Sequence, residues 1–493
     1  MPVGLVLTVV LALASVGAFV VVGPVLTLAM LVIVGIAFVT IIKPTAAVLA
    51  VAAIVYSNAA ALAVTFYGAP SIVAAAVPLL LVAPGLYYLG LQFRPLIIPP
   101  AATWLLALFT IQIVSTLLAA DQWSAVGFLF TFILEGLVVF FLVTNAIRER
   151  RMLYLTLWVL LLTGAALGAI SGFQQVTQTY YTAYLGFGQI GDGVVPLSAT
   201  LGAELKPRLA GPIGESNYYA QYMLMLVPLG IVLIRIERRP VMKLLALGAT
   251  ALVITAMATA ASRGGFLGLV IVLMVLTLLG YIRPGQLLVG GLVALVALSA
   301  ISPGYINRLI RLQDVASGTE DADTAVLGRI GENTAALLAF SDHPIIGVGP
   351  GQFRNVYQDY ARKLGADIHE GARVAHSLYL STLAELGIVG AFAFFGAIAT
   401  TMWGLVRWRS RLRAREPELV DMASAMFVSL IGFLATGIFL DLAYARYFWF
   451  MLAVAAAAGH LVSRAMRDEA EGEVSTPSLT VTPVAAASAG PAG

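Results

Sequence analysis

Long apolar segments recur along most of the chain, and they restrict the possible folds more than any other feature of the sequence. On the criterion that a transmembrane helix needs about 20 apolar residues, we count roughly fourteen segments. They lie near residues 4–22, 25–42, 46–67, 71–92, 101–120, 124–146, 152–174, 217–235, 242–261, 265–281, 286–301, 376–405, 420–440 and 447–463. Only 11% of the residues are charged, against roughly 25% in soluble domains. We therefore predict an all-α polytopic membrane protein with about 12–14 transmembrane helices.

The basic residues predict how these helices are oriented. Lysine and arginine concentrate in the short cytoplasmic loops of membrane proteins. Here they follow every second predicted helix, at Lys43, Arg94, 148–151, 235–239, Arg283 and 407–415. We place these ends in the cytoplasm, together with a tail (464–493) whose composition predicts disorder. The two long polar loops, residues 175–216 and 302–375, then face outward, and we expect any chemistry there.

Composition excludes several kinds of site. The chain has no cysteine, so it contains neither disulfides nor cysteine-ligated zinc. The basic residues cluster at the ends of apolar segments and form no phosphate-binding stripe, so nucleic acid is not an expected partner. Asp321 and Asp323 have a spacing that can hold a divalent cation, but the polar stretch around them favours a solvated loop. We expect no metal and no cofactor.

The segment HSLYLSTLAELGIVG (376–390) sets a histidine at the start of an apolar helix. At 100° per residue, Gly387 and Gly390 fall within about 40° of the direction of His376. The histidine and the two glycines thus share one stripe, and the glycines allow close approach of another helix or of a lipid chain. Glu385 points about 180° away and is not expected to contact His376.

His376 is a candidate general base. The positive end of the helix macrodipole disfavours a protonated imidazole, so a histidine in the first helical turn stays neutral and can accept a proton near pH 7. The alternative is a histidine that only caps the helix at the membrane interface. Position alone favours this second interpretation.

Three arginines are predicted at the outer face. Arg208 lies in PRLAGPIGESN before a spanning helix, Arg263 lies in ASRGGF at a helix end, and Arg329 opens a short helix expected over residues 328–344. A guanidinium matches phosphate oxygens bidentately, so several together can neutralise a diphosphate without a metal. Each alone is also explained by contact with lipid headgroups or by pairing with a loop carboxylate.

The glycine-rich segment HPIIGVGPGQF (343–353) lies between Arg329 and His376. Its backbone N–H groups can form an anion-binding nest. Glycine and proline at these positions can equally form tight turns, which is their commoner role.

Four of these segments resemble motifs of the O-antigen ligase and Wzy-type polymerase superfamily. H-S-x9-G-x-x-G (His376 to Gly390) resembles its histidine signature, and the stretch from Arg329 to Phe353 looks like its R…PxxGxGxxxF loop motif. PRLAGPIGESNYYAQ and ASRGGF are similar to its other arginine elements, although SN stands where NP is usual. The resemblance covers roughly residues 120–463, between N-terminal helices (1–119) and the tail (464–493).

The resemblance implies a GT-C-type membrane glycosyltransferase of the bacterial cytoplasmic membrane, with its active site facing outward. It implies transfer of a glycan from undecaprenyl diphosphate to the hydroxyl of an acceptor glycolipid, glycan or protein, with inversion and without a metal. His376 matches the essential histidine, and Arg208, Arg263 and Arg329 match arginines near the donor diphosphate. The lipid chain is expected in a groove between helices, beside the Gly387 and Gly390 stripe.

Two alternatives to a ligase remain open. A polymerase that extends the glycan on its lipid carrier would share these motifs. A transporter would place ionisable groups at the bilayer midplane, where Glu135 and Glu385 are the main candidates. The predicted arginines and His376 lie at the outer face instead, which favours the enzyme.

Overall fold

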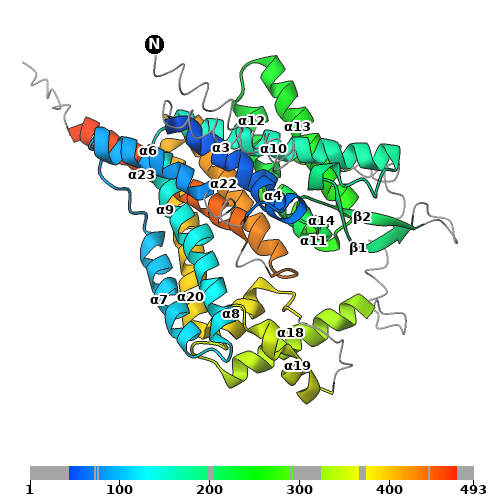
Figure 1. The fold of residues 1–493 in the computed structure, drawn as a ribbon. Helices are drawn as coiled ribbons and strands as arrows, with labels where there is room; N and C mark the ends of the chain where they lie inside the picture. The colour runs from blue at the N-terminus through cyan, green and yellow to red at the C-terminus, as the bar shows by residue number, and fades with distance from the viewer. Residues whose placement is uncertain are drawn as a thin grey trace, which may run out of the picture.

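The computed structural model describes residues 44–70, 74, 77–196, 205–288, 291, 324–365, 373–441 and 445–474. This part of the chain is almost entirely helical (Figure 1). Seven of its helices are long and apolar enough to span a membrane, and the bent pair α3–α4 adds an eighth if it is one span. The prediction of an all-α polytopic membrane protein is confirmed. The helices predicted at 4–22 and 25–42, and most of 286–301, lie outside the described residues.

The elements are as follows: α3 (Pro44–Ser57), α4 (Ala59–Tyr67), η1 (Val77–Leu81), α6 (Val82–Leu86), η2 (Tyr87–Leu91), α7 (Ala101–Leu117), α8 (Gln122–Thr131), η3 (Phe132–Val138), α9 (Val139–Ala146), α10 (Arg150–Thr177), η4 (Tyr184–Gly186), β1 (Gln189–Pro196), β2 (Leu205–Gly211), α11 (Ser216–Leu224), α12 (Val227–Ile236), α13 (Pro240–Ala260), α14 (Arg263–Leu278), α18 (Thr324–Asp342), α19 (Phe353–Lys363), α20 (Leu378–Val406), α21 (Arg409–Leu412), α22 (Pro417–Thr436) and α23 (Arg446–Val474).

Helix ends follow from local chemistry. The side chain of Ser262 accepts a hydrogen bond from the N–H of Gly265 and caps α14, and Asp121 caps α8 in the same way through Ser124. Asn58, between α3 and α4, adopts a left-handed conformation (φ 57°). The axes of the two helices differ in direction by 52° at this residue. Asparagine tolerates this conformation better than most residues do, so the predicted helix 46–67 is bent at that point.

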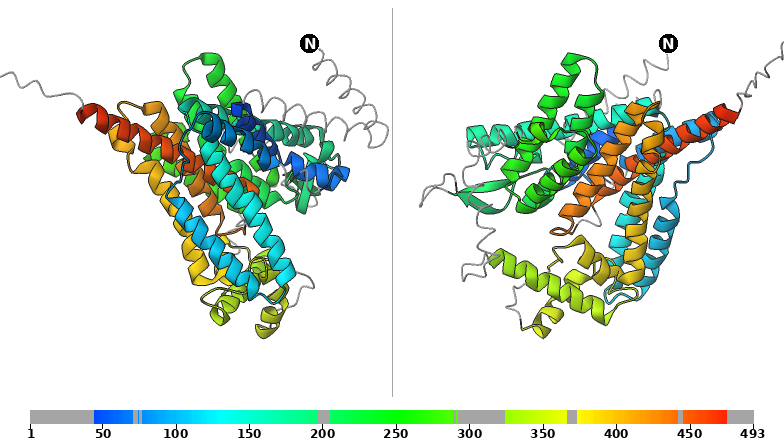
Figure 2. Two further views of the ribbon diagram at one scale, coloured as in Figure 1. Left: turned by 60° about the vertical axis from the view of Figure 1, so that its left-hand side comes forward. Right: turned by 180° about the vertical axis from the view of Figure 1, so that it is seen from behind.

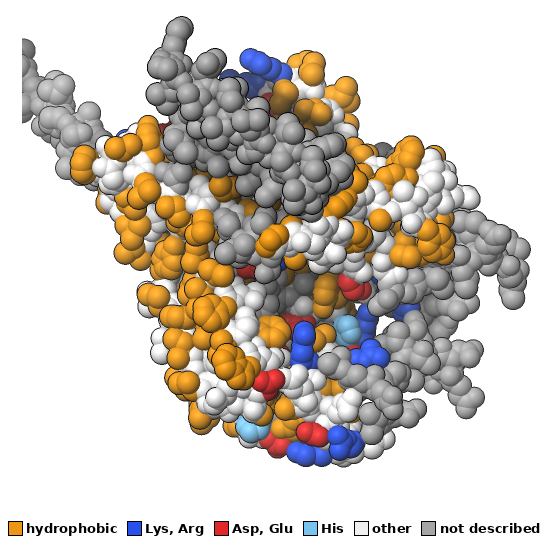
Figure 3. Space-filling model, viewed as in Figure 1, with side chains coloured by type: hydrophobic (Ala, Val, Ile, Leu, Met, Phe, Trp, Pro, Cys, Tyr) orange, Lys and Arg blue, Asp and Glu red, His pale blue; other side chains and the backbone are white. Residues whose placement is uncertain are grey.

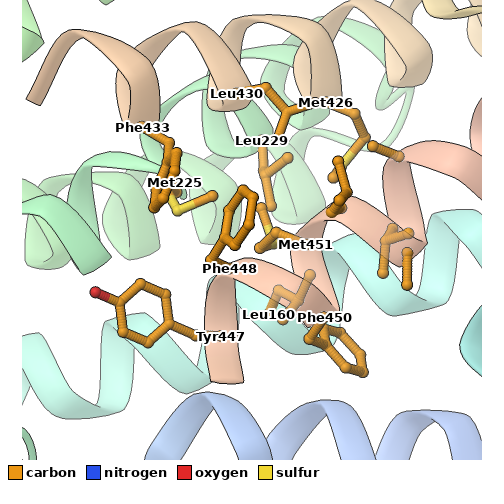
Figure 4. Packing of buried hydrophobic residues seen from close by; sticks show 14 of the residues in the cluster. Leu160, Met225, Leu229, Met426, Leu430, Phe433, Tyr447, Phe448, Phe450 and Met451 are labelled. Atoms are coloured by element: carbon orange, nitrogen blue, oxygen red, sulfur yellow. The ribbon is translucent and has the colours of Figure 1, made fainter. Parts of the chain in front are cut away.

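The bundle core lies where α12, α22 and α23 meet α10 (Figure 4). The rings of Phe433 and Phe448 stack there with centroids 4.2 Å apart. Small residues set the closest helix crossings. A Cβ on Gly168 of α10 would lie 2.1 Å from the carbonyl oxygen of Leu252 of α13, so only glycine fits at that crossing.

Helices α18 and α19 form a separate lobe, which we call the α18–α19 lobe. It packs at the far end of α7, α8 and α20 and stands apart from the rest of the bundle (Figures 1 and 2). It has its own apolar cluster, formed by Ala335, Ala336, Ala339, Phe353, Tyr357, Tyr360, Ala361, Ala375 and Ala384. Ala384 belongs to α20, so the cluster packs the lobe against the first turns of that helix.

Two local features depart from the predictions. The predicted loop 175–216 contains an antiparallel pair of strands, β1 and β2, with Ile190 opposite Leu209. Helix α23 continues to Val474, so the first part of the predicted tail, residues 464–474, is helical. Residues 464–474 contain neither proline nor a glycine cluster that would end the helix earlier.

Candidate functional site

His376 contacts a buried carboxylate. It directly precedes Ser377, the N-cap of α20, whose side chain accepts from the N–H of Leu380. Its Nε2 lies 3.2 Å from Oε2 of Glu332 on α18, a distance at which a ring N–H donates to a carboxylate. The imidazole is 27% exposed and the carboxylate only 7%, so the histidine is the accessible member of the pair.

This contact fixes the tautomer of the imidazole. A carboxylate only accepts hydrogen bonds, so the Nε2 that faces Glu332 carries the proton. The other ring nitrogen, Nδ1, then holds a lone pair. Nδ1 of His376 is buried and has no hydrogen-bond partner among the described residues. It is therefore the basic atom of the ring, although the surrounding protein atoms enclose it.

The surroundings keep His376 neutral. Burial, and after it the positive charges of Arg329 and Arg373, together lower the pKa of His376 to about 4. At pH 7 the contact with Glu332 is therefore an N–H facing a carboxylate and not an ion pair. Arg373, whose guanidinium lies 3.8 Å from Oε1 of Glu332, offsets the charge of that carboxylate. The sequence predicted a neutral His376 from the helix dipole. In the structure, burial and the charges of two arginines favour the neutral imidazole as well.

Arg329 connects the lobe to the bundle electrostatically. It lies on α18, three residues before Glu332, and its positive charge lowers the pKa of His376. Arg329 and Arg354 also lie within electrostatic range of the Tyr218 hydroxyl, near the start of α11. The predicted site residues of the lobe thus face the first turn of a bundle helix.

Arg208 and the segment that carries Arg263 come together in space. Arg208 is 5% exposed; its Nε donates to the carbonyl of Ala260 (2.9 Å) and its guanidinium to the side-chain oxygen of Asn217 (2.8 Å). The same oxygen of Asn217 accepts from Ser262, the N-cap of α14. Arg263 follows as the first residue of α14 and is half-buried. Arg208 therefore holds the helix end that presents Arg263.

Charged side chains gather around a hollow between the bundle and the α18–α19 lobe. Figure 3 shows basic and acidic side chains and a histidine on the walls of this hollow. Apolar side chains are numerous on the helices above and to the left of the hollow in that view. A polar hollow beneath an apolar bundle suits a substrate with a charged head and an apolar tail.

Glu385 and the glycine-rich segment 343–353 form a clasp, and not an open anion nest. The N–H of Gly351 donates to the carboxylate of Glu385 (2.8 Å), and the N–H of Gly349 donates to the backbone carbonyl of Glu385 (3.0 Å). The loop N–H groups are thus used to dock the lobe on α20. Glu385 therefore binds the loop at Gly349 and Gly351, in agreement with the expectation that it does not contact His376.

The predicted stripe from His376 to Gly390 is wrong, because α20 is interrupted at Gly387. This glycine has φ 65° and ψ −172°, a conformation that other residues rarely adopt. A Cβ there would lie 2.2 Å from the carbonyl oxygen of Ile345. A Cβ on Gly390 would meet Leu386 and, at 3.5 Å, Ile111 of α7. Protein atoms therefore lie beside both glycines, those of the loop around Ile345 beside Gly387 and those of α7 beside Gly390, and not a lipid groove.

A cavity of about 380 Å³ opens among side chains, most of them apolar, of α3, α4, η1, α8 and η3, and Arg446 of α23 also lines it. Its wall contains an ion pair, Arg446–Glu135, with 3.0 Å between NH2 and Oε1. Arg446 starts α23, and the next residue, Tyr447, donates to the side chain of Gln221 on α11. The cavity is thus at the same end of the bundle as Tyr218 of α11.

No group of three or more metal-ligating side chains occurs in the described ranges. Asp321 and Asp323 lie outside them.

Sequence reasoning missed Glu332, Arg373 and Arg446. Glu332 could have been found from its spacing, because it follows Arg329 by three residues on one predicted helix and residues three apart share a helix face. Arg373 and Arg446 had no such signal, since their partners come from distant segments.

Residues 247–395 match the family model described as O-antigen ligase. The matched segment contains Arg263, Arg329 and His376, and Arg208 precedes it. A comparison with curated proteins finds no match to the chain. The match confirms the resemblance to the O-antigen ligase and Wzy-type superfamily and supports a membrane enzyme of the glycosyltransferase kind.

Proposed function

We propose that this protein transfers a glycan from undecaprenyl diphosphate to an acceptor hydroxyl at the outer face of the bacterial cytoplasmic membrane. The observation that carries the proposal is the neutral His376, oriented by Glu332 and flanked by arginines, within a segment that matches the O-antigen ligase family. The orientation with His376 outward rests on the basic residues of the predicted cytoplasmic loops.

Nδ1 of His376 acts as the general base. The acceptor oxygen attacks the anomeric carbon and its proton moves to Nδ1 as the new C–O bond forms. The bond between the anomeric carbon and the diphosphate oxygen breaks on the opposite face, which inverts the configuration. The imidazolium that results is stabilised by the carboxylate of Glu332, in the way a carboxylate supports the histidine of a hydrolase triad.

Arg263 and Arg329 bind the donor diphosphate. The leaving lipid diphosphate gains negative charge as the bond breaks, and guanidinium groups in a partly dehydrated site stabilise that charge. Arg208 is buried and donates to Ala260 and Asn217, so we assign it to positioning the start of α14.

Donor binding prepares the base. Arg329 lowers the pKa of His376 in the free protein. A diphosphate on Arg329 opposes that charge, so the pKa of His376 rises towards neutrality when the donor is bound. The histidine is thus a better base in the complex than in the free protein.

The apolar cavity beside Arg446 accommodates part of the lipid chain. Its apolar walls match a polyprenyl chain, and its ion pair lies at the same end of the bundle as Tyr218. This replaces the groove expected beside Gly387 and Gly390.

Product analysis tests the proposal. Purified protein is incubated with a synthetic undecaprenyl-diphosphate oligosaccharide and candidate acceptors. A single transfer to a different acceptor identifies a ligase, and a ladder on undecaprenyl diphosphate identifies a polymerase. Binding of the donor with no product under any acceptor condition would contradict the proposal and favour a transporter.

A further inference from the structure

We propose that a second polar cavity, at the end of the bundle opposite His376, binds the phosphate of an anionic phospholipid. The cavity has a volume of about 750 Å³ and lies between the segment 92–98, the junction of α9 and α10, and the last turns of α23. We call it the arginine pocket. Four arginines line it: Arg94, Arg148, Arg464 and Arg467.

The hydrogen bonds of α20 place the arginine pocket at the far end from the candidate active site. His376 precedes the first residue of α20, and Arg407 follows its last residue. Arg407 donates to Ser463, the neighbour of Arg464 in the pocket (2.8 Å). A helix rises 1.5 Å per residue, so the part of α20 that follows the break at Gly387 alone spans about 28 Å, close to the hydrocarbon thickness of a bilayer.

The charge of the pocket suits a phosphate group. Its four arginines face two carboxylates, those of Glu149 and Asp468, which leaves an excess of positive charge. Asp468 is only loosely paired with Arg464, at 3.7 Å. Among the described residues, the guanidinium groups of Arg94 and Arg467 make neither an ion pair nor a hydrogen bond, and both are exposed.

The rear wall of the pocket is rigid. Arg148 donates through Nε and NH2 to the carbonyl and side-chain oxygens of Asn145, and through NH1 to the carbonyl of Pro95. It also lies 5.4 Å from the centre of the Tyr88 ring. This fixed charge is preorganised, so a ligand does not have to order it.

Exposed apolar side chains around Arg94 indicate that the phosphate belongs to a lipid. Leu91, Phe93, Leu96 and Ile98 are 75%, 86%, 53% and 68% exposed. Side chains of this kind insert at the boundary of headgroups and acyl chains, while adjacent arginines reach the phosphates. Basic pockets between transmembrane helices on the cytoplasmic side recognise anionic headgroups by the same means. A phosphate dissolved in the cytoplasm would gain nothing from the apolar rim.

Thermal denaturation of the full chain in neutral detergent tests this site. Phosphatidylglycerol is added in one arm, phosphatidylcholine in a second and inorganic phosphate in a third. The variant Arg94→Gln/Arg467→Gln removes the two charges that have no partner among the described residues, and Arg467→Gln alone is the milder form. Arg283→Gln/Arg411→Gln removes the same charge from exposed arginines outside the pocket and serves as the matched control.

We expect phosphatidylglycerol to raise the Tm of the wild type and of the control by several degrees more than phosphatidylcholine does, because a ligand that binds only the folded state stabilises it. We expect this difference to fall by at least half in Arg467→Gln and to vanish in the double variant. Equal responses of all variants would overturn the proposal. A response to inorganic phosphate as large as that to phosphatidylglycerol would overturn the assignment to a lipid.

Discussion

Nε2 of His376 lies 3.2 Å from a carboxylate oxygen of Glu332, and this contact joins the residue before the N-cap of α20 to the α18–α19 lobe. It orients the imidazole and, in the proposed mechanism, leaves Nδ1 as the proton acceptor. The lobe therefore contributes to the base and does not merely cover it.

Replacing Glu332 by glutamine should lower kcat by about 10- to 1,000-fold with little change in KM. The amide oxygen can still accept from Nε2 of His376, but the charge that stabilises the imidazolium is lost. Steady-state kinetics with saturating acceptor measures the effect. Glu418→Gln, a change of an exposed carboxylate remote from His376, is the control. A kcat within twofold of the wild type would exclude the role of Glu332.

The pH dependence should report the lowered pKa of His376. The base must be neutral, so kcat/KM should be constant at neutral pH and should fall only as the pH drops through about 4. The acid limb of kcat should lie at higher pH, because the bound diphosphate opposes the charge of Arg329. In Glu332→Gln both limbs should move to lower pH, since a negative charge beside the imidazole is removed. If the acid limbs of kcat and kcat/KM fell at the same pH, this would argue against a rise in the pKa of His376 when the donor binds.

Gly387→Ala should destabilise the protein strongly. The new Cβ would lie 2.2 Å from the carbonyl oxygen of Ile345, and alanine disfavours the observed φ of 65°. We expect a loss of about 2–4 kcal/mol, comparable to other core substitutions with a named clash. Gly248→Ala is the matched control, because nothing lies within 4 Å of its Cβ and it is inside α13. Thermal denaturation should show a lower Tm for the first variant and an unchanged or higher Tm for the second.

Arg208→Lys should raise the KM for the lipid-linked donor by about tenfold or more with a smaller change in kcat, a loss of roughly 1.4 kcal/mol in binding. A lysine cannot reach both the carbonyl of Ala260 and the side chain of Asn217, so the start of α14 and with it Arg263 lose their support. Arg283→Lys, at an exposed position, should have no effect. An unchanged donor KM in Arg208→Lys would show that Arg263 does not depend on this network.

Local and periodic features of the sequence predicted most of the fold. Apolar length located helices such as α10 and α13 to within a few residues, because burial in lipid requires a continuous apolar stretch. His376, Arg263 and Arg329 were identified from motifs and from their position outside the apolar segments. The break at Gly387 was not predictable from helical periodicity, since it depends on the approach of Ile345 from a distant loop.

The partners of the site residues were harder to predict for the same reason. Glu332 and His376 belong to different helices, and their contact depends on how the lobe docks. Asn217 joins Arg208 to Ser262 through one side-chain oxygen, a relation that no spacing in the sequence reveals. Side-chain identity suggested the chemistry, and tertiary packing determined which groups act together.

The central claim is that His376 removes the acceptor proton. Single-turnover transfer from a radiolabelled undecaprenyl-diphosphate oligosaccharide, with donor binding measured in parallel, tests it most directly in the wild type and in His376→Ala. We predict that transfer slows by about 100- to 10,000-fold in the variant while donor affinity stays within a few-fold. Transfer at the wild-type rate in His376→Ala would contradict the claim.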